Sequence, residues 1–223
     1  MKEPFKIVFE DEYIVILEKI AKILILPSPE KEKYTLTSLL EEQLKIPVYP
    51  CHRLDRETSG LIIYAKTKDI QEKIMNQFRD GSVKKAYLAF VRGRLKNKKG
   101  VLSGYIIDRE GKRFGEKPKK AKTLYRVIRE FKNYSLIDLM PLTGRTNQLR
   151  IQLANIGNPI LGERKYAFGR DFKVNSKRLA LHAYFLSFSH PVNGKKFIFR
   201  LDLPPDMKSF IPHVNHASSK PAI

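Results

Sequence analysis

The stretch "YPCHRLDRETSGLIIYAKT", residues 49–67, places a single acid inside a basic cluster and continues at once into an apolar run. Asp55 lies between Arg53 and Arg56, and residues 61–65 are all apolar or aromatic. A short apolar run bounded by turn residues predicts a buried strand. The polar segment before it is therefore either an ordinary cluster of surface ion pairs or a group of side chains that acts on a substrate.

Four segments around this stretch have clear secondary-structure patterns. Residues 5–19 predict two short strands around a turn at "EDE", and residues 35–44 predict a short helix with acids on its polar face. Residues 67–81 predict the clearest helix, which Thr67 caps at its start and a glycine ends. Residues 83–93 predict a further strand, which closes on a glycine.

The C-terminal half adds two predicted hairpins and one helix. Residues 123–142 predict a hairpin across "KN", residues 143–159 a helix ended by glycine and proline, and residues 179–205 a hairpin around "PVNG". Residues 94–120 carry two basic runs and are the least regular part of the chain. They are either a solvated loop or hairpin, or a flap that contacts phosphates.

Strands outnumber helices in this pattern, and short turns join most neighbouring strands. Such a pattern favours an α+β domain built on a largely antiparallel, mixed sheet with flanking helices. No internal repeat or long linker divides the chain. We expect one domain over residues 1–212 and a disordered tail of small and polar residues at 213–223.

The 223-residue chain is strongly basic, since 43 lysines and arginines against 23 acids give a net charge of +20. A field of this sign attracts polyanions, and without an amphipathic anchor or lipidation signal a nucleic acid is favoured over a membrane. The N-terminus is no secretory signal, and no apolar run reaches the roughly 18 residues of a membrane helix, so we expect a cytoplasmic protein. The single cysteine, Cys51, excludes an intramolecular disulfide and a CxxC site.

Several common catalytic motifs are absent from the sequence. There is no HExxH, no Walker lysine loop, no GxGxxG after a strand and no GxSxG, and we expect no metal site. Any catalysis then depends on a single acid, on arginines and tyrosines, and on the shape of a cleft. Charge alone does not separate such an enzyme from a binding module.

Three motifs occur in an order typical of one enzyme family. "HRLDRETSGLIIYAKT" is similar to H-R-L-D-x-x-T-S-G followed by an apolar strand, and "KKAYLAFVRG" is similar to K-x-Y-x-A-x-V-x-G. "PLTGRTNQLRIQLANIGNPILGERKY" resembles T-G-R-x-H-Q-[IL]-R with G-x-P-I-x-G-D-x-x-Y after it, and "KKAKTLYRV" and "LALHAYFLSFSHP" resemble two further strands of that family. Over residues 5 to about 205 the chain resembles the RluA-type pseudouridine synthases.

The resemblance implies that specific uridines in rRNA or tRNA are isomerised to pseudouridine. The N1–C1′ bond breaks, the uracil rotates, and C5 bonds to C1′. The resemblance also implies the pseudouridine synthase fold with a central RNA-binding cleft. The reaction that it implies needs no cofactor, and we expect the protein to be a monomer. The main alternative is a catalytically inactive basic RNA-binding protein of the same fold. A base-directed glycosylase is a second rival, and it would release free uracil.

The resemblance also assigns the residues of the site. Asp55 is the expected nucleophile, which attacks either the uracil ring or C1′, and Arg150 is its expected partner, opposing the pKa rise that burial causes. Tyr87 is expected against the target base, as a general base or as a stacking platform. Arg53 is expected to enter the space that the flipped base leaves. Further RNA-binding candidates are His52, Arg56, Arg145, Asn147 and Lys85.

The chain departs from the family pattern at three places. Asn147 stands where the family usually has His, Glu163 stands where it usually has Asp, and residues 18–29 lack the usual N-K-P-x-G. An amide still donates and accepts hydrogen bonds, so Asn147 can keep a supporting role. The motifs begin at His52, so we expect no N-terminal S4 domain of the kind that many relatives carry, and we expect the charge of the catalytic domain to supply RNA affinity.

Overall fold

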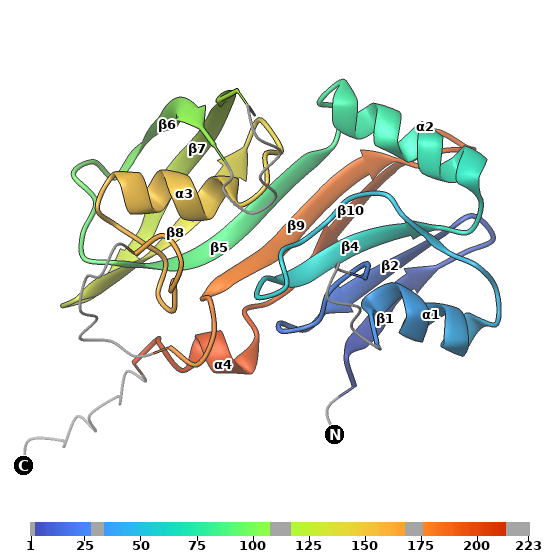
Figure 1. The fold of residues 1–223 in the computed structure, drawn as a ribbon, viewed down its shortest axis with the longest axis horizontal. Helices are drawn as coiled ribbons and strands as arrows, with labels where there is room; N and C mark the ends of the chain where they lie inside the picture. The colour runs from blue at the N-terminus through green and yellow to red at the C-terminus, as the bar shows by residue number, and fades with distance from the viewer. Residues whose placement is uncertain (1–2, 28–33, 108–116, 168–175, 213–223) are drawn as a thin grey trace, which may run out of the picture.

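The computed structural model describes residues 3–27, 34–107, 117–167 and 176–212, and within them ten strands form one sheet (Figure 1). The strand order is β1-β2-β4-β9-β5-β8-β7-β6, with β3 beside β4 and β10 beside β9. The strands are β1 (Phe5–Glu10), β2 (Ile14–Lys19), β3 (Tyr49–Pro50), β4 (Ser59–Ala65), β5 (Lys84–Arg92), β6 (Lys99–Ile106), β7 (Lys119–Glu130), β8 (Tyr134–Pro141), β9 (Leu181–Ser189) and β10 (Lys196–Arg200). The helices are α1 (Leu36–Leu44), α2 (Lys68–Arg79), α3 (Gln148–Asn155) and α4 (Pro205–Lys208).

The pairing of these strands confirms the predicted α+β class with a largely antiparallel, mixed sheet. Among the named strands of the described residues, β4 and β9 pair in parallel and all other pairs are antiparallel. The predicted hairpins β1–β2, β7–β8 and β9–β10 are confirmed. No helix in this part of the chain is long and apolar enough to cross a membrane.

Both faces of β4 are covered, which explains its continuous apolar run. Every residue of Ser59–Ala65 is buried. Ile62 and Tyr64 pack in a cluster with α1, whereas Leu61 and Ile63 pack in another with α2. Because alternate residues of a strand point to opposite faces, the two helices cover opposite faces of this part of the sheet.

The two long helices of the N-terminal half begin at caps. Thr35 and Ser38 form a capping box at the start of α1. The Thr67 hydroxyl accepts a 3.3 Å hydrogen bond from the Ile70 amide of α2. Gly81, two residues beyond the end of α2, has φ +79°, the left-handed conformation that commonly ends a helix. The predicted limits of α2 are therefore confirmed.

One half of the sheet contains β1 to β4 and the other contains β5 to β10, and the two halves meet at one close backbone contact between β4 and β9. β4 and β9 are joined through two residue pairs, Ser59 with His182 and Gly60 with Ala183. Gly60 has φ +123°, and a Cβ atom there would lie 2.2 Å from the carbonyl oxygen of Ala183. Only glycine accommodates this approach. The glycine of "TSG" is thus required by the sheet that supports the loop of Asp55.

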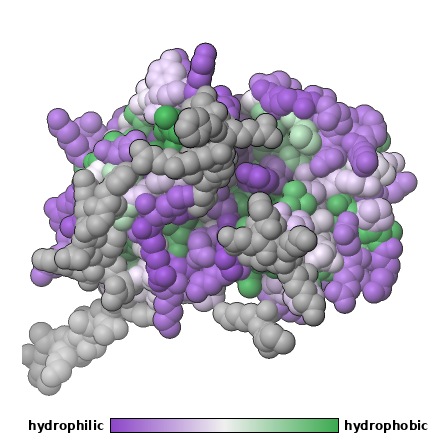
Figure 2. Space-filling view, in the orientation of Figure 1, coloured by the Kyte–Doolittle hydropathy of each residue, from purple (hydrophilic) through white to green (hydrophobic). Residues whose placement is uncertain are grey.

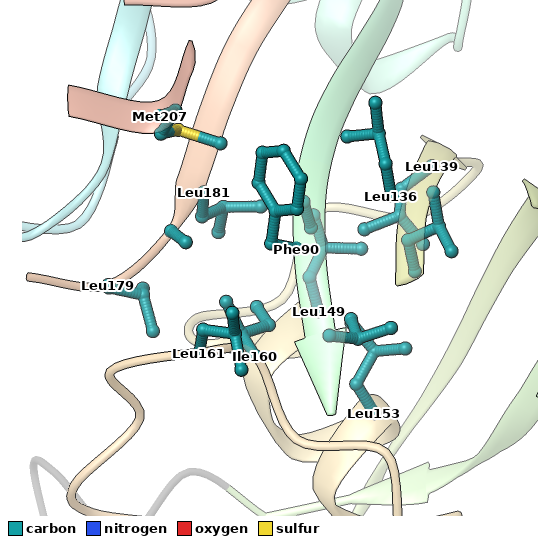
Figure 3. Close-up of a cluster of buried hydrophobic side chains, with 14 of the residues drawn as sticks. Phe90, Leu136, Leu139, Leu149, Leu153, Ile160, Leu161, Leu179, Leu181 and Met207 are labelled. Atoms are coloured by element: carbon teal, nitrogen blue, oxygen red, sulfur yellow. The ribbon is translucent and has the colours of Figure 1, made fainter. Parts of the chain in front are cut away.

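A separate apolar cluster fills the second half of the molecule (Figure 3). It joins Phe90 of β5, Leu149 and Leu153 of α3, and Met207 of α4. Tyr87 of β5 packs, partly buried, against both this cluster and the cluster beneath α1. Tyr87 therefore lies at the junction of the two halves.

The described part of segment 94–120 is a hairpin, one of the alternatives that the sequence left open. β6 pairs with the start of β7, which begins at Lys119 rather than at residue 123. Leu102 and Ile106 are buried, while the outer positions of β6 hold lysine, serine and exposed apolar residues. Because polar and apolar residues mix on this outer face, the sequence of β6 lacks the alternation of polar and apolar residues that identifies a strand. Residues 108–116 and the predicted tail at 213–223 lie outside the described residues.

α3 is shorter than predicted, beginning at Gln148 rather than at Thr143. Asn147 has φ +53°, a left-handed conformation that does not continue into a right-handed helix. Residues 143–147 consequently form a loop, which we call the entry loop, in front of α3.

Candidate active site

The loop that carries Asp55 is held mainly by its own backbone. It leaves β3 and enters β4, and the Cys51 amide donates a 2.9 Å hydrogen bond to the Ile63 carbonyl. The Asp55 carbonyl accepts from the Thr58 amide at 3.0 Å, and the Arg56 carbonyl accepts from the Lys22 amide at 2.7 Å. The side chain of Leu54, just before the acid, is buried in the cluster under α1, so the loop is fixed on both sides of Asp55.

A buried lysine that the sequence analysis did not single out supports the same loop. Lys19, the last residue of β2, has no exposed surface, and its ammonium donates to the carbonyls of Ile20 at 3.0 Å and Arg56 at 3.1 Å. Burial lowers the pKa of Lys19 to about 7, although the charges of Asp55 and Glu57 favour its protonated form. The available signal was a lysine at the end of the apolar strand "IVILEK".

Tyr87 reaches the site from the opposite half of the sheet. It pairs with Ala183 of β9 and Leu139 of β8, next to a register shift in the β5–β9 pairing. Burial, with a further contribution from the charge of Asp55, raises the pKa of Tyr87 above its ordinary value. Tyr87 is therefore a neutral phenol near neutral pH, with a hydroxyl proton to donate.

Arg150 of α3 is held in a buried polar cluster. Its Nε and Nη2 donate to the two carboxylate oxygens of Glu163 at 2.6 and 2.9 Å, and its Nη1 donates to Oδ1 of Asn147 at 2.8 Å. The guanidinium also lies over the ring of Tyr166, 5.1 Å from its centroid. Burial opposes the charge, but Glu163 and, more weakly, Asp55 outweigh it and raise the pKa of Arg150.

Glu163 is the second supporting residue that the sequence analysis did not place in the site. Its side chain is fully buried and also accepts from the amides of Lys165 at 2.8 Å and Tyr166 at 3.1 Å. Burial raises its pKa, but the hydrogen bonds and charge of Arg150 more than compensate and hold that pKa below the ordinary value. Its departure from the family's usual aspartate was visible in the sequence, whereas its partner was not.

His52, on this loop, and Lys85, on β5, both contact Phe78 of α2. Nε2 of His52 accepts a 3.2 Å hydrogen bond from the Ile63 amide, and its ring lies 4.8 Å from the ring of Phe78. Burial and the charge of Lys85 lower the pKa of His52 to about 3, so the ring is neutral. Lys85 lies over the same Phe78 ring, and burial lowers its pKa. A contact of either residue with RNA stays a prediction.

The other candidate residues divide into exposed cations and a buried amide. Arg53, Arg56 and Arg145 are exposed, and Nε of Arg145 donates to the Lys120 carbonyl of β7 at 3.2 Å. Asn147 is only 4% exposed and supports Arg150 as described above. Figure 2 shows hydrophilic side chains over much of the face that carries α1 and α3.

The charge of Asp55, on the loop before β4, influences side chains on three other elements. That charge acts on Lys19 of β2, Tyr87 of β5 and Arg150 of α3, and each of these residues lies in a different part of the sequence. A carboxylate that interacts electrostatically with a guanidinium and a neutral phenol is a candidate nucleophile.

Comparison with known proteins identifies the family. The family model described as RNA pseudouridylate synthase matches residues 13–155. The "Dual-specificity RNA pseudouridine synthase RluA" of Pasteurella multocida is 37% identical, over 86% of this chain and 90% of that protein. The "Ribosomal large subunit pseudouridine synthase D" of Nitrosomonas europaea is 34% identical over 96% of this chain, which spans 66% of that relative.

Solved structures agree with this assignment. The structure titled "Human RNA Pseudouridylate Synthase Domain Containing 4" matches with a TM-score of 0.75 and 25% identity, covering 90% of this chain and 89% of that one. The fold, the order of the three motifs and the matched relatives all lead to the same assignment. The chain belongs to the RNA pseudouridylate synthase family, whose members convert uridine in RNA to pseudouridine.

Proposed function

We propose that this protein isomerises specific uridines in rRNA or tRNA, with Asp55 as the nucleophile and with the target base flipped out of its stack. The observation that supports this most directly is the convergence of Lys19, Tyr87 and Arg150 on the charge of one carboxylate. The net charge of +20 favours a polyanionic substrate.

In this proposal the carboxylate of Asp55 attacks the uracil ring or C1′ of the ribose, and the N1–C1′ bond breaks. The uracil turns so that C5 bonds to C1′, and the proton lost from C5 is balanced by the proton gained at N1. Arg150 and Lys19 favour the ionised carboxylate against its burial. No atom is gained or lost overall, so the reaction needs no co-reactant.

The raised pKa of Tyr87 bears on its role. A phenol that is neutral at rest is a poor general base until a neighbouring group takes its proton. It can still stack on the uracil and donate a hydrogen bond to a developing negative charge. We therefore assign Tyr87 to binding and orientation of the rotating base.

Arg53 is the proposed flipping residue. It is exposed, two residues before Asp55, on a loop whose backbone is fixed. Extrusion of a stacked base costs a few kcal/mol, and a guanidinium that stacks in the vacated space offsets part of that cost. Arg56 and Arg145 are exposed and suit contacts with phosphate.

The test is to map pseudouridine in total RNA from cells with the protein, without it, and with Asp55→Asn in its place. Sites lost in the second and third strains identify the substrate and support the nucleophile. If deletion removes no site, the inactive RNA-binding alternative is favoured. Release of free uracil from RNA by the purified protein would instead indicate a glycosylase.

A further inference from the structure

α3 rests on β7 and β6 through two buried glutamines on one side of the helix. Gln148 and Gln152 are four residues apart, and they are 4% and 6% exposed. The oxygen of Gln152 accepts a 2.7 Å hydrogen bond from the Thr123 hydroxyl of β7. Its amide nitrogen donates to the Leu102 carbonyl of β6 at 3.1 Å. Gln152 therefore joins the helix to the sheet only.

Gln148 joins the helix to the sheet and also to the entry loop. Its amide nitrogen donates to the Lys122 carbonyl at 3.2 Å and to the Thr123 hydroxyl at 2.9 Å, both on β7. Its oxygen accepts from the Thr143 hydroxyl at 2.7 Å and from the Arg145 amide at 3.1 Å. Two donors and two lone pairs of one amide are thus all used.

The entry loop links the cationic edge of the hairpin to the arginine of the site. Arg145 reaches back to the Lys120 carbonyl of β7. At the other end of the loop, Asn147 accepts a hydrogen bond from Arg150. The main chain of β7 at Lys120 and Lys122 is thus joined by hydrogen bonds to the entry loop and to Gln148, and the last residue of that loop accepts from Arg150.

We propose that Gln148 is a positioning residue for the reaction: it fixes Arg150 relative to Asp55 and couples that position to RNA bound along β7. Gln152 shows that a buried amide can simply join α3 to the sheet, whereas the oxygen of Gln148 also holds the entry loop. The inference rests on the proposed site of Asp55 and Arg150.

The test compares Gln148→Met with the matched variant Gln152→Met. Both remove an amide from the same side of the same helix, but only the first releases the entry loop. We expect similar losses of thermal stability. The single-turnover rate at saturating RNA should fall about 10–100-fold for Gln148→Met, because small misplacements of reacting groups have effects of this size, and less than about threefold for Gln152→Met. RNA affinity should change little in either variant.

The pH dependence provides a second readout. Gln148→Met alters orientation rather than charge, so its rate loss should be the same at every pH, with the acid limb of the profile unmoved. Equal rate losses in both variants, or a wild-type rate in a folded Gln148→Met, would overturn the inference. If Gln148→Met does not fold, Thr143→Val replaces it in the comparison of single-turnover rates with Gln152→Met, because it removes one hydrogen-bond donor to Gln148.

The coupling to RNA is tested with a double-mutant cycle. The side chain of Lys122 is exposed, and its backbone carbonyl is a partner of Gln148. Lys122→Ala should lower the saturated rate of the wild type but not that of Gln148→Met, and additive effects would refute the coupling. A wild type that is inactive on its mapped RNA refutes the proposed function, whereas an active wild type with an unaffected Gln148→Met refutes the positioning role alone.

Discussion

The acid and the arginine of the site are held in different ways. Asp55 lies in a loop fixed by backbone hydrogen bonds and by the apolar packing of Leu54. Arg150 is fixed by polar side chains, directly by Glu163 and Asn147 and through the entry loop by Gln148. The N-terminal half thus places its functional group mainly through main-chain groups and apolar core, with the ammonium of Lys19 on one carbonyl of the loop, and the C-terminal half through a network of polar side chains.

This difference predicts that substitutions at the two positions affect catalysis and stability to different extents. A side chain on a backbone-held loop can be exchanged without removing the main-chain hydrogen bonds of that loop, so substitutions of Asp55 should affect the reaction more than stability. A buried polar network is stable only when every member is satisfied. Substitutions around Arg150 should therefore disturb both stability and the reaction.

Asp55→Asn gives the largest expected effect. The amide is nearly the same size, and the backbone contacts of the loop do not involve the exchanged carboxylate, so the thermal midpoint should change little. The single-turnover rate should fall by at least about 10³-fold, as for other nucleophile deletions. RNA binding should stay within a few-fold. A clear loss of stability would break the comparison, and residual activity in protein shown to be free of deamidation would refute the nucleophile.

Arg150→Met should reverse the pH dependence of stability. In the wild type the pKa of Glu163 is held below its ordinary value of about 4.3, so the pair stabilises above that pH and loses its effect as pH falls. In the variant, burial, the largest influence on the pKa of Glu163, is opposed only by the amide hydrogen bonds of Lys165 and Tyr166. We therefore expect that pKa to rise above its ordinary value, and the free energy of unfolding to fall as pH rises through about 4.3. The unpaired carboxylate should cost about 3–5 kcal/mol near neutral pH.

Urea unfolding of Arg150→Met at about pH 4 and about pH 7 measures this reversal. The double variant Arg150→Met/Glu163→Gln is the control, since it removes the titrating carboxylate and should abolish the variant's pH dependence. The acid limb of the pH–rate profile should also move to higher pH, because Arg150 no longer favours ionised Asp55. Unchanged stability of the single variant would show that Arg150 is not held by its polar partners.

Lys19→Met sharpens the comparison within the N-terminal half. The folded-state pKa of Lys19 is about 7, below its unfolded value of about 10.4, so the unfolded state binds more protons between these values. Stability of the wild type should therefore rise from about pH 7 to about pH 10 on account of Lys19, and Lys19→Met should lose this rise. Unfolding curves across that range test it. An identical slope in wild type and variant would assign the rise to other groups.

Arg53→Ala gives the smallest and most selective expected effect. It should leave stability unchanged, because the side chain is exposed. The rate should fall more on a stem-loop than on an unstructured oligonucleotide with the same uridine, since only the stem-loop requires unstacking. Lys22→Ala, which removes another exposed cation near the loop, is the control for charge alone. Equal losses on both substrates would argue against a flipping role.

Most of the fold could be predicted from local sequence patterns such as apolar runs and helix caps. The apolar run before Lys66 and the capped pattern after Thr67 correctly predicted β4 and α2, because propensity and burial agree there. The start of α3 was wrong, since a left-handed Asn147 is set by the contacts of the entry loop and not by local propensity. β6 was not separated from a loop because its outer face mixes polar and apolar residues.

The site was less accessible from the sequence than the fold. Asp55, Tyr87 and Arg150 were singled out because each lies in a motif that resembles a known family. Lys19 and Glu163 were not, because a buried charge is recognised by its partners, and those partners lie 37 and 13 residues away in the chain. Only the folded arrangement shows that these charges are satisfied.

The contact between β4 and β9 also constrains when the protein can mature during its synthesis. Ser59 and His182 share a buried 2.9 Å hydrogen bond across 123 residues of chain. When the segment of Asp55 and the strand after it, β4, leave the ribosome, β9, which pairs with one edge of β4, has not yet been translated. Until β9 arrives, an apolar strand has an unpaired edge, a state that favours aggregation or chaperone binding. A fragment that stops before residue 181 lacks β9, so β4 and β5 are not joined through it and we expect such a fragment to be inactive.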